Sequence, residues 1–216
     1  MSWSVILQKL LEGMAVSVEI FTLTLLLSLP LGLFVALGRM SSNSILRYFI
    51  KIYISIMRGT PLMLQLMVVY YGPFYLFGIS LAKGYRFTAV IIGFVLNYAA
   101  YFAEIYRGGI ESMPVGQYEA AKLLGYSKTQ TFMKIILPQV IKRILPSITN
   151  EIITLIKDTS LAFVISVSEM FTNAKALASA ETTMIPFVVA GIFYYIFNYI
   201  VAFIMEWTEK KLSYYK

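Results

Sequence analysis

Long uninterrupted apolar stretches dominate this 216-residue chain and limit the folds that it can adopt. A helix that spans a lipid bilayer needs about 20 mostly apolar residues. Only 13% of the residues are charged, whereas about 25% is usual for a soluble domain. The sequence therefore predicts an all-α membrane protein, with one transmembrane domain over residues 1–216 and five transmembrane helices. The predicted spans are about 16–37, 60–82, 87–107, 144–169 and 184–206.

The five stretches do not support the prediction equally. The stretch 144–169 contains Glu151, Lys157 and Asp158, so its hydropathy supports a span least. The other stretches are predominantly apolar, with charges only at Glu19, Glu104, Arg107 and Glu206, whereas the strands of a membrane β-barrel alternate between apolar and polar residues. The stretch 16–37 is longer than the apolar region of a cleaved signal peptide and lacks a small-residue cleavage site.

The basic residues predict the orientation of the spans. An odd number of spans places the two termini on opposite sides of the membrane. Thirteen of the 18 Lys and Arg residues then fall on one side and four on the other, with Lys157 inside a span. Cytoplasmic loops carry the excess of basic residues, so the N-terminus is expected outside and the C-terminus in the cytoplasm. The larger group is Arg39, Arg47, Lys51, Arg58, Arg107, Lys122, Lys128, Lys134, Lys142, Arg143, Lys210, Lys211 and Lys216, and the smaller is Lys9, Lys83, Arg86 and Lys175.

The chain lacks residues that common catalytic, metal-binding and nucleotide-binding sites require. The chain has no histidine or cysteine, and no Gly-Lys dipeptide with which a Walker-type phosphate loop could be built. We therefore predict no catalytic residue, no metal ligand and no cofactor in this chain, and expect energy for transport to come from a partner. The net charge of +7 is explained by the predicted topology, so we expect no nucleic-acid partner.

The segment 108–143 is the one long loop between the predicted spans. Pro114 suits the first turn of a short helix, and Gly125 suits its left-handed C-terminal cap. Residues 127–130 form a capping-box pattern that opens a second helix through Leu137, which Pro138 is expected to disturb. A two-turn helix is unstable alone in water and needs a surface to dock on. It either packs on its own membrane domain as a lid or docks into a cytoplasmic partner.

The same loop carries a resemblance to a known family. Glu119-Ala120-Ala121, followed at fixed spacing by Gly125, Ile135 and Leu137-Pro138, resembles the EAA loop of ABC importer permeases. Three flanking segments, at 58–62, 103–110 and 157–161, are similar to those of the polar amino acid permease branch, the histidine, arginine and glutamine type. The resemblance extends over about residues 14–210.

The resemblance implies the ABC type-1 permease fold, in the inner membrane of a prokaryotic cell. It implies two separate ATPase subunits that bind ATP and Mg, a second permease subunit and an extracytoplasmic amino acid-binding protein. The second permease is either an identical copy or a close paralogue. The short cytoplasmic helix between spans three and four would couple the permease to an ATPase subunit. The residues expected to make this coupling are Glu119, Ala120, Ala121, Leu124, Gly125, Leu137 and Pro138.

Polar residues within the spans are candidates for the substrate path, because ionisable groups in a membrane are costly and mark a path or a pair. Asp158 and Asn97 fall near the middle of their spans, and Glu151 lies seven residues before Asp158 on nearly the same helical face. Asp158 either meets substrate or makes a structural bond. Glu104 either lines the path or pairs with a nearby arginine, and Glu19 is either a gate or an interfacial residue.

These features predict the membrane-spanning permease subunit of an ATP-driven importer of a polar amino acid. A basic amino acid is favoured, because carboxylates outnumber lysine and arginine within the spans. The same type of importer could instead take a neutral amino acid or another small nutrient as cargo. The EAA loop disfavours a passive channel or an ion-coupled carrier, and the lack of histidine and cysteine disfavours a membrane-embedded enzyme.

Overall fold

The computed structural model describes residues 3–82 and 84–212, and all regular structure in these two segments is helical, as predicted. Lys83 and Lys216, which entered the orientation argument, lie outside the described residues. The helices are α1 (Trp3–Arg39), α2 (Ser44–Gly59), α3 (Leu62–Phe77), α4 (Tyr85–Glu111), α5 (Val115–Leu123), α6 (Lys128–Thr131), the π-helix η1 (Phe132–Ile136), α7 (Leu137–Asp158), the 3-10 helix η2 (Thr159–Ile165), α8 (Met170–Glu181) and α9 (Ile185–Leu212).

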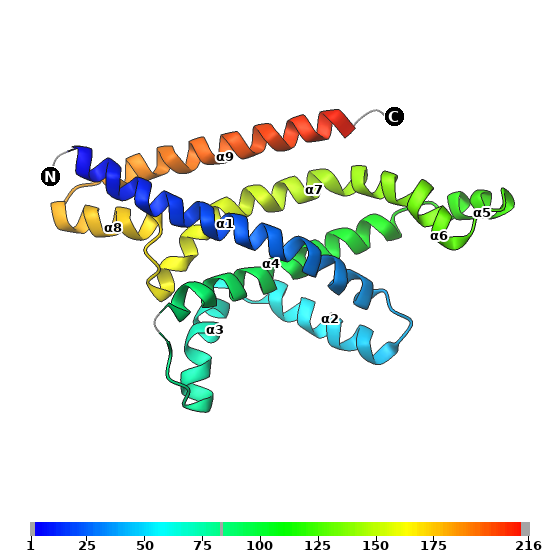
Figure 1. Cartoon of the computed structure of the whole chain (residues 1–216), viewed down its shortest axis with the longest axis horizontal. Helices are drawn as coiled ribbons and strands as arrows, with labels where there is room; N and C mark the ends of the chain where they lie inside the picture. The colour runs from blue at the N-terminus through cyan, green and yellow to red at the C-terminus, as the bar shows by residue number, and fades with distance from the viewer. Residues whose placement is uncertain (1–2, 83, 213–216) are drawn as a thin grey trace.

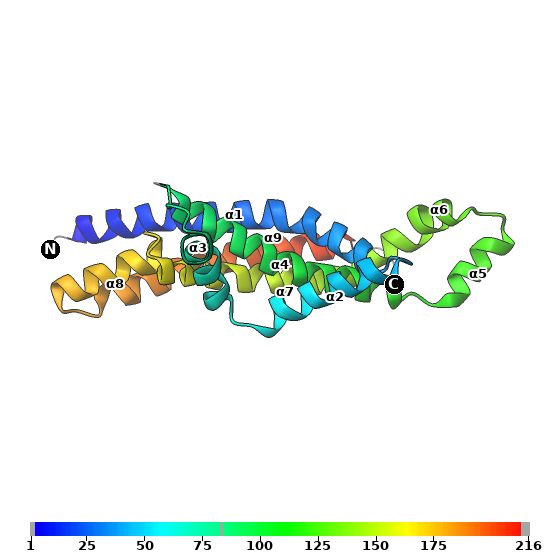
Figure 2. The ribbon, with the colours of Figure 1, turned by 90° about the horizontal axis from the view of Figure 1, so that it is seen from below.

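The helices form an elongated bundle. Helices α1, α4, α7 and α9 run along its long axis, and α3 projects away from the others (Figure 1). The hairpin that contains α5 and α6 extends from one end, whereas α8 lies beside the first turns of α1 at the other end (Figure 2). The start of α1 and the end of α9 therefore lie toward opposite ends of the bundle.

The core of the bundle lies where α1, α3, α4 and α7 meet. Ile20, Leu66, Phe94 and Leu155 are fully buried in it. Helix α1 approaches α4 closely at Gly32, where an added Cβ would lie 2.8 Å from Cβ of Phe102. Small residues allow such close contact between membrane helices, which associate largely through packing.

The predicted second span, 60–82, contains α3 as one shorter helix, and the structure adds a helix before it that was not predicted. The sequence from Ser44 onward is already helical as α2, and α2 and α3 are bent by 111° at Thr60-Pro61. Proline disfavours a helical conformation at the residue before it, and Thr60 is extended (φ −123°). At its other end α3 stops at Gly78, which adopts a left-handed conformation (φ +66°) and leaves 79–82 outside the helix.

The predicted fourth span, 144–169, is helical as far as Ile165 but changes its helical geometry at Thr159. Helix α7 ends at Asp158 and tightens into the 3-10 helix η2. The hydroxyls of Thr159 and Ser160 donate to the carbonyls three residues before them, at 2.8 and 2.7 Å. Such side-chain bonds compete with the regular helical pattern. Ser166 then ends η2 in a left-handed conformation (φ +59°).

The length and apolarity of the helices support fewer membrane spans than five. Helices α1, α4 and α9 are each long and apolar enough to span a membrane, and the bent α2–α3 pair gives a fourth if it counts as one span. Helix α7 carries five charged residues, which lower its hydropathy: Lys142, Arg143, Glu151, Lys157 and Asp158. The five-span count therefore remains a prediction.

The predicted loop 108–143 is mostly helical. Helix α5 ends before Gly125, which has the expected left-handed conformation (φ +79°), and Ser127 and Gln130 form the expected capping box. The expectation that the second helix ends at Leu137 is wrong, because the chain continues through η1 into α7. A π-helix widens the turn just before Pro138, and a helix can pass a proline where its turn adjusts in this way.

Candidate functional site

A cavity of about 390 Å³ lies where α4 and α7 meet the break between α2 and α3. Two carboxylates face it, and none of its ten lining residues is a lysine or an arginine. It is thus an acidic, partly apolar site that could hold a small polar molecule. The lining residues are Thr60, Pro61, Leu62, Asn97, Tyr98, Tyr101, Glu151, Thr154, Asp158 and Leu161.

Helix α7 supplies the acidic side of the cavity. Glu151, Thr154 and Asp158 are spaced by three and four residues, so the helix places them on one face. Asp158 Oδ2 accepts a 2.8 Å hydrogen bond from the hydroxyl of Tyr98 on α4. This bond leaves Oδ1 of Asp158 as the carboxylate oxygen for which no partner is recorded among the described residues. Asp158 therefore both joins two helices and retains capacity to bind a ligand.

Helix α4 supplies Asn97, and its amide is largely committed to the helix break. Asn97 Nδ2 donates at 3.0 Å to the carbonyl of Met57 and at 3.0 Å to Oε1 of Gln65. Gln65 Nε2 in turn donates to Met57 and Thr60. The last carbonyls of a helix have no partner within the helix, and here the two amide side chains satisfy them at the end of α2. Asn97 is 5% exposed, so it shapes the cavity wall more than it reaches into the cavity.

The other two predicted path residues lie outside the cavity. Glu104 accepts two hydrogen bonds from Arg107, at 2.6 and 3.1 Å, and lies 3.7 Å from Arg58. Arg107 also bonds Glu111, so Glu104 belongs to a charge network near the end of α4. Glu19 is exposed on α1, away from the cavity lining. The structure thus brings together Asp158 and Asn97 but not Glu19 and Glu104.

Of the ten lining residues, the sequence predicted only Asp158 and Asn97 as site residues. The spacing of Glu151 from Asp158 puts both on one helical face, and this signal could have placed Glu151 in the site. Tyr101 follows Asn97 by four residues and shares its helical face. Tyr98 and Thr60 carried no such signal, because their positions depend on the packing of α4 against α7 and on the break after α2.

Arg58, the last charged residue of α2, lies at the edge of the cavity. Its guanidinium carbon is 5.3 Å from the centroid of the Tyr101 ring, a distance suited to a cation–π contact. Its Nη1 lies 3.7 Å from Oε2 of Glu104. Arg58 is thus a fixed cation between the cavity and the charge network beyond it.

The predicted coupling residues lie on the hairpin at the end of the bundle. The side chains of Leu123 and Leu124 are 89% and 75% exposed, and Glu119 and Ala120 are also exposed. Ala121 is 1% exposed and faces the chain itself. In a lid that packs on its own membrane domain these leucines would be buried, so their exposure contradicts that interpretation. The short helix therefore carries an exposed apolar surface. Gly125 forms the reversal after it, and Leu137 and Pro138 begin α7.

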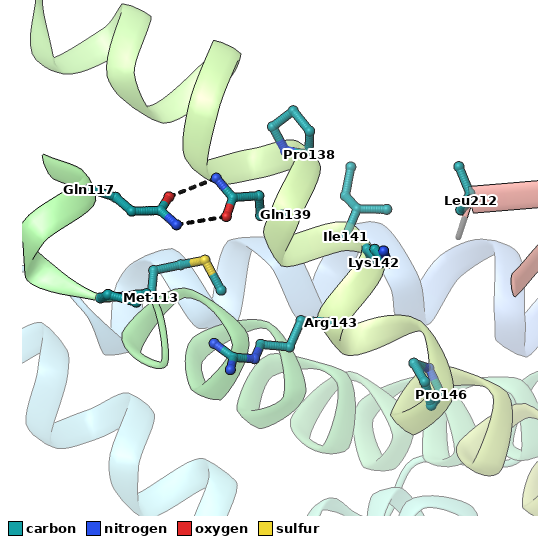
Figure 3. A pocket seen from close by; sticks show the side chains of 10 residues that line it. Met113, Gln117, Pro138, Gln139, Ile141, Lys142, Arg143, Pro146 and Leu212 are labelled. Atoms are coloured by element: carbon teal, nitrogen blue, oxygen red, sulfur yellow. Dashed lines mark hydrogen bonds between the residues drawn. The ribbon is translucent and has the colours of Figure 1, made fainter. Parts of the chain in front are cut away.

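A second cavity, of about 480 Å³, lies at the base of this hairpin (Figure 3). It is lined by residues just before and within α5, by the first turns of α7 and by the end of α9. In Figure 3 the amide groups of Gln117 and Gln139, which both line it, point toward each other and are joined by two hydrogen bonds. Arg143 of α7 donates at 2.7 Å to the carbonyl of Ser112, just after α4.

Comparison with known proteins agrees across most of the chain. Residues 28–214 match the family model described as binding-protein-dependent transport system inner membrane component. An arginine transport system permease protein of Bacillus subtilis is 36% identical over 205 residues, which cover 94% of this chain and 92% of that protein. An L-cystine transport system permease protein of the same organism is 40% identical over 206 residues, 92% of this chain and 84% of that one. A Rickettsia bellii permease protein named for glutamine transport is 38% identical over 205 residues, 94% and 92% of the two chains.

The fold has also been seen in experimental structures. The crystal structure of an amino acid ABC transporter with histidines contains a chain that superposes with a TM-score of 0.86 at 30% identity, covering 94% of both chains. A chain of an inward-facing methionine ABC transporter superposes with a TM-score of 0.76 at 16% identity, covering 99% of this chain and all of that one.

Proposed function

Because the chain belongs to the family of binding-protein-dependent transport system inner membrane components, we propose that it forms the substrate path of an ATP-driven importer for a basic amino acid. It is an amino acid ABC transporter permease and has no catalytic role of its own. The observation that carries the proposed substrate is the cavity between α4 and α7, which two carboxylates line without a basic side chain.

The permease would work within a larger assembly in a bacterial inner membrane. Its family is named for dependence on a binding protein, which would deliver the amino acid from outside. Two ATPase subunits would bind ATP and Mg and drive the cycle, and a second permease subunit would complete the path. This chain contributes the membrane path and the surface on which an ATPase docks.

The orientation proposed for the chain places the α5 hairpin in the cytoplasm. It rests on the excess of basic residues on that side and on the opposite ends of the bundle at which α1 starts and α9 ends (Figure 1). The chain has no cysteine, so single cysteines can be introduced freely. With Lys128→Cys an impermeant thiol reagent should label only from the inside, and with Lys175→Cys only from the outside. Labelling of Lys128→Cys in intact cells would contradict the orientation.

The exposed hairpin supports a coupling role for α5. A nine-residue helix with exposed leucines gains stability from a partner surface, and a rigid helix seated in a cleft transmits movement as a rigid body. Glu119 would accept a charge-assisted hydrogen bond from a basic residue of the ATPase. Glu119→Lys should therefore weaken ATPase association, whereas the folded membrane domain should persist. Unchanged association with this variant would contradict the coupling role.

The two carboxylates of the cavity favour a cationic substrate. A cation that crosses the bilayer needs a local anion, because an unpaired charge there is costly. Oδ1 of Asp158 and the carboxylate of Glu151 would face the substrate's cationic group, and Thr154 offers a hydroxyl beside them. The aromatic ring of Tyr101 could pack on an extended side chain.

A neutral amino acid is the second candidate, and Arg58 is the observation that favours it. This cation lies against Tyr101 at the cavity edge and could balance one carboxylate. The remaining charge would then suit a zwitterion. The relatives named for glutamine and cystine transport show that such cargoes occur among similar permeases.

Uptake by the complete importer separates the two candidates. Asp158→Asn and Glu151→Gln remove one charge each at nearly constant size. With a basic substrate, loss of a charge-assisted bond should lower uptake of arginine and lysine by about 10- to 150-fold and that of glutamine and cystine much less. Glu206→Gln, which removes an exposed carboxylate of α9, is the matched control. If both cavity variants take up all four amino acids at the wild-type rate, the proposed site is contradicted.

A further inference from the structure

Gln117 and Gln139 form a reciprocal pair of hydrogen bonds between the coupling hairpin and helix α7. Gln117 Nε2 donates to Oε1 of Gln139 at 2.9 Å, and Gln139 Nε2 donates to Oε1 of Gln117 at 2.7 Å. Both side chains are partly buried at the base of the hairpin (Figure 3). Two parallel bonds between planar amides fix orientation as well as distance.

A third bond determines which way the two amides face. Gln139 Nε2 also donates at 2.7 Å to the carbonyl of Ile135, which lies in the π-helix η1. A flip of the Gln139 amide would place its oxygen against this carbonyl and lose the bond. Once Gln139 is oriented, only one orientation of Gln117 can complete both bonds of the pair. The pair is therefore fixed to the one irregular turn at the start of α7.

Few other contacts could hold α5 at its angle. In the part of the chain that the structure describes, no other side chain of α5 makes a recorded hydrogen bond or ion pair. Ala121 is the one buried side chain of the helix. It lies four residues after Gln117, so both share the face toward the chain itself. The amide pair thus provides the directional contact between α5 and α7.

The other leg of the hairpin is held to the same helix. Arg143 Nη1 donates to the carbonyl of Ser112 at 2.7 Å and to its hydroxyl at 3.2 Å. Ser112 caps the end of α4, and Arg143 follows Gln139 by four residues on α7. Helix α7 therefore contacts both the start of the hairpin, at Ser112, and the coupling helix within it, at Gln117.

We propose that the Gln117–Gln139 pair is a positioning element that makes α5 and α7 move as one body. This inference rests on the proposed coupling function of α5. Helix α7 carries Glu151 and Asp158, so motion passed from α5 through the pair reaches the cavity along one helix, which continues past Pro146. Without the pair, α5 could still seat in the ATPase, but its motion would be lost at the hairpin base.

The proposal predicts a defect in coupling rather than in assembly. Gln117→Leu removes both bonds and leaves the Gln139 amide incompletely paired. In the reconstituted importer, the amount of labelled arginine or glutamine transported per ATP hydrolysed should fall about two- to tenfold. ATPase association should stay at the wild-type level. Gln8→Leu, the same change at an exposed glutamine near the start of α1 and away from the hairpin, is the matched control.

An ion pair introduced at the same two positions provides a rescue. Gln117→Glu places a carboxylate oxygen against Oε1 of Gln139, and Gln139→Arg leaves Nε2 of Gln117 without an acceptor. The combined variant restores two parallel bonds, since arginine and a carboxylate form a bidentate pair. Each single variant should transport less per ATP, and the double variant should recover at least half of the loss. If Gln139→Arg does not assemble, the two variants at Gln117, on the exposed helix, test the proposal alone.

The outcomes separate this inference from the coupling function. If both Gln117 variants keep wild-type transport per ATP while Glu119→Lys weakens ATPase association, the positioning role is wrong and the coupling role stands. If Glu119→Lys has no effect on association, the coupling role fails whatever the Gln117 variants do. A loss of thermal stability with unchanged transport per ATP would show that the pair only stabilises the hairpin and would also overturn the proposal.

Discussion

The hydroxyl of Tyr98 on α4 donates a 2.8 Å hydrogen bond to Oδ2 of Asp158 on α7, across the wall of the acidic cavity. Tyr98 is 2% exposed, so this bond lies within the helix contact rather than in the open cavity. It holds the Asp158 carboxylate in one orientation. The same residue pair therefore links the packing of α4 and α7 to the geometry of the candidate site.

Tyr98→Phe should weaken this link without creating a void. The variant removes only the hydroxyl, and hydrogen bonds between membrane helices contribute about 0.6 kcal/mol on average and up to about 1.7. The free energy of unfolding in detergent should fall by this amount, measured as a lower melting temperature. Tyr101→Phe is the matched control, because no hydrogen bond of the Tyr101 hydroxyl is recorded among the described residues. An equal shift for both variants would contradict a specific role for the Tyr98 bond.

Gly109 and Gly108 offer a sharper test of the α4–α7 contact. A Cβ added at Gly109 would overlap Cγ2 of Ile144 and lie 3.3 Å from Cγ1 of Val140, whereas one added at Gly108 would meet no atom within 4 Å. Ile144 is β-branched and cannot easily turn away. Gly109→Ala should destabilise the protein by about 1–3 kcal/mol, as overpacked sites do. Gly108→Ala should melt at or above the wild-type temperature, because alanine favours a helix.

The local features of the hairpin could be predicted from sequence because each depends on neighbouring residues. Gly125 follows a run of helix-forming residues, and Ser127 and Gln130 form a capping box within one turn. The helix α2 was missed for the opposite reason. Its three basic residues, Arg47, Lys51 and Arg58, keep its mean hydropathy below that of a membrane span, although their spacing of four and seven residues places them on one face of an amphipathic helix.

The candidate site was only partly predictable because the fold assembles it from distant segments. Spacing placed Glu151 and Asp158 on one face of a helix, and Asn97 near the same depth. Sequence could not show that Tyr98 would bond Asp158 or that the break at Pro61 would open the cavity wall. These contacts depend on how helices pack, which hydropathy does not specify. The pairing of Glu104 with Arg107, by contrast, was one of two interpretations of the sequence, because the two residues are three positions apart on one helix.

Gly125→Val should damage the hairpin of α5 and α6, for which we propose the coupling role, while leaving the membrane helices folded. Gly125 adopts φ +79°, and a residue with a side chain pays about 1–2 kcal/mol in a left-handed conformation, with more strain for a β-branched one. Substrate-stimulated ATP hydrolysis by the assembled importer should therefore fall, with a nearly unchanged melting temperature. Gly125→Asn is the control, because asparagine tolerates this conformation, and it should retain most activity. Full activity of Gly125→Val would show that the reversal is not needed.

Glu169 should be the most sensitive carboxylate for stability. It is fully buried, and its two oxygens accept hydrogen bonds from the backbone N–H groups of Phe171 and Thr172, both at 2.7 Å. The hydroxyls of Thr172, Tyr194 and Ser17 add donors at 2.8, 3.1 and 3.5 Å. Glu169 thereby caps α8 and joins it to α1 and α9.

Glu169→Gln keeps the size of this side chain but replaces one accepting oxygen with an NH₂ group, which would face N–H and O–H donors. A buried donor without a partner costs about 1–3 kcal/mol, so the free energy of unfolding should fall by this amount. Hydrogen exchange of the first amides of α8 should also accelerate, because the cap is lost. Glu206→Gln breaks an exposed ion pair with Lys210, at 3.1 Å, and should change stability by no more than about 0.5 kcal/mol. If the two variants melt at the same temperature, Glu169 does not hold the three helices together.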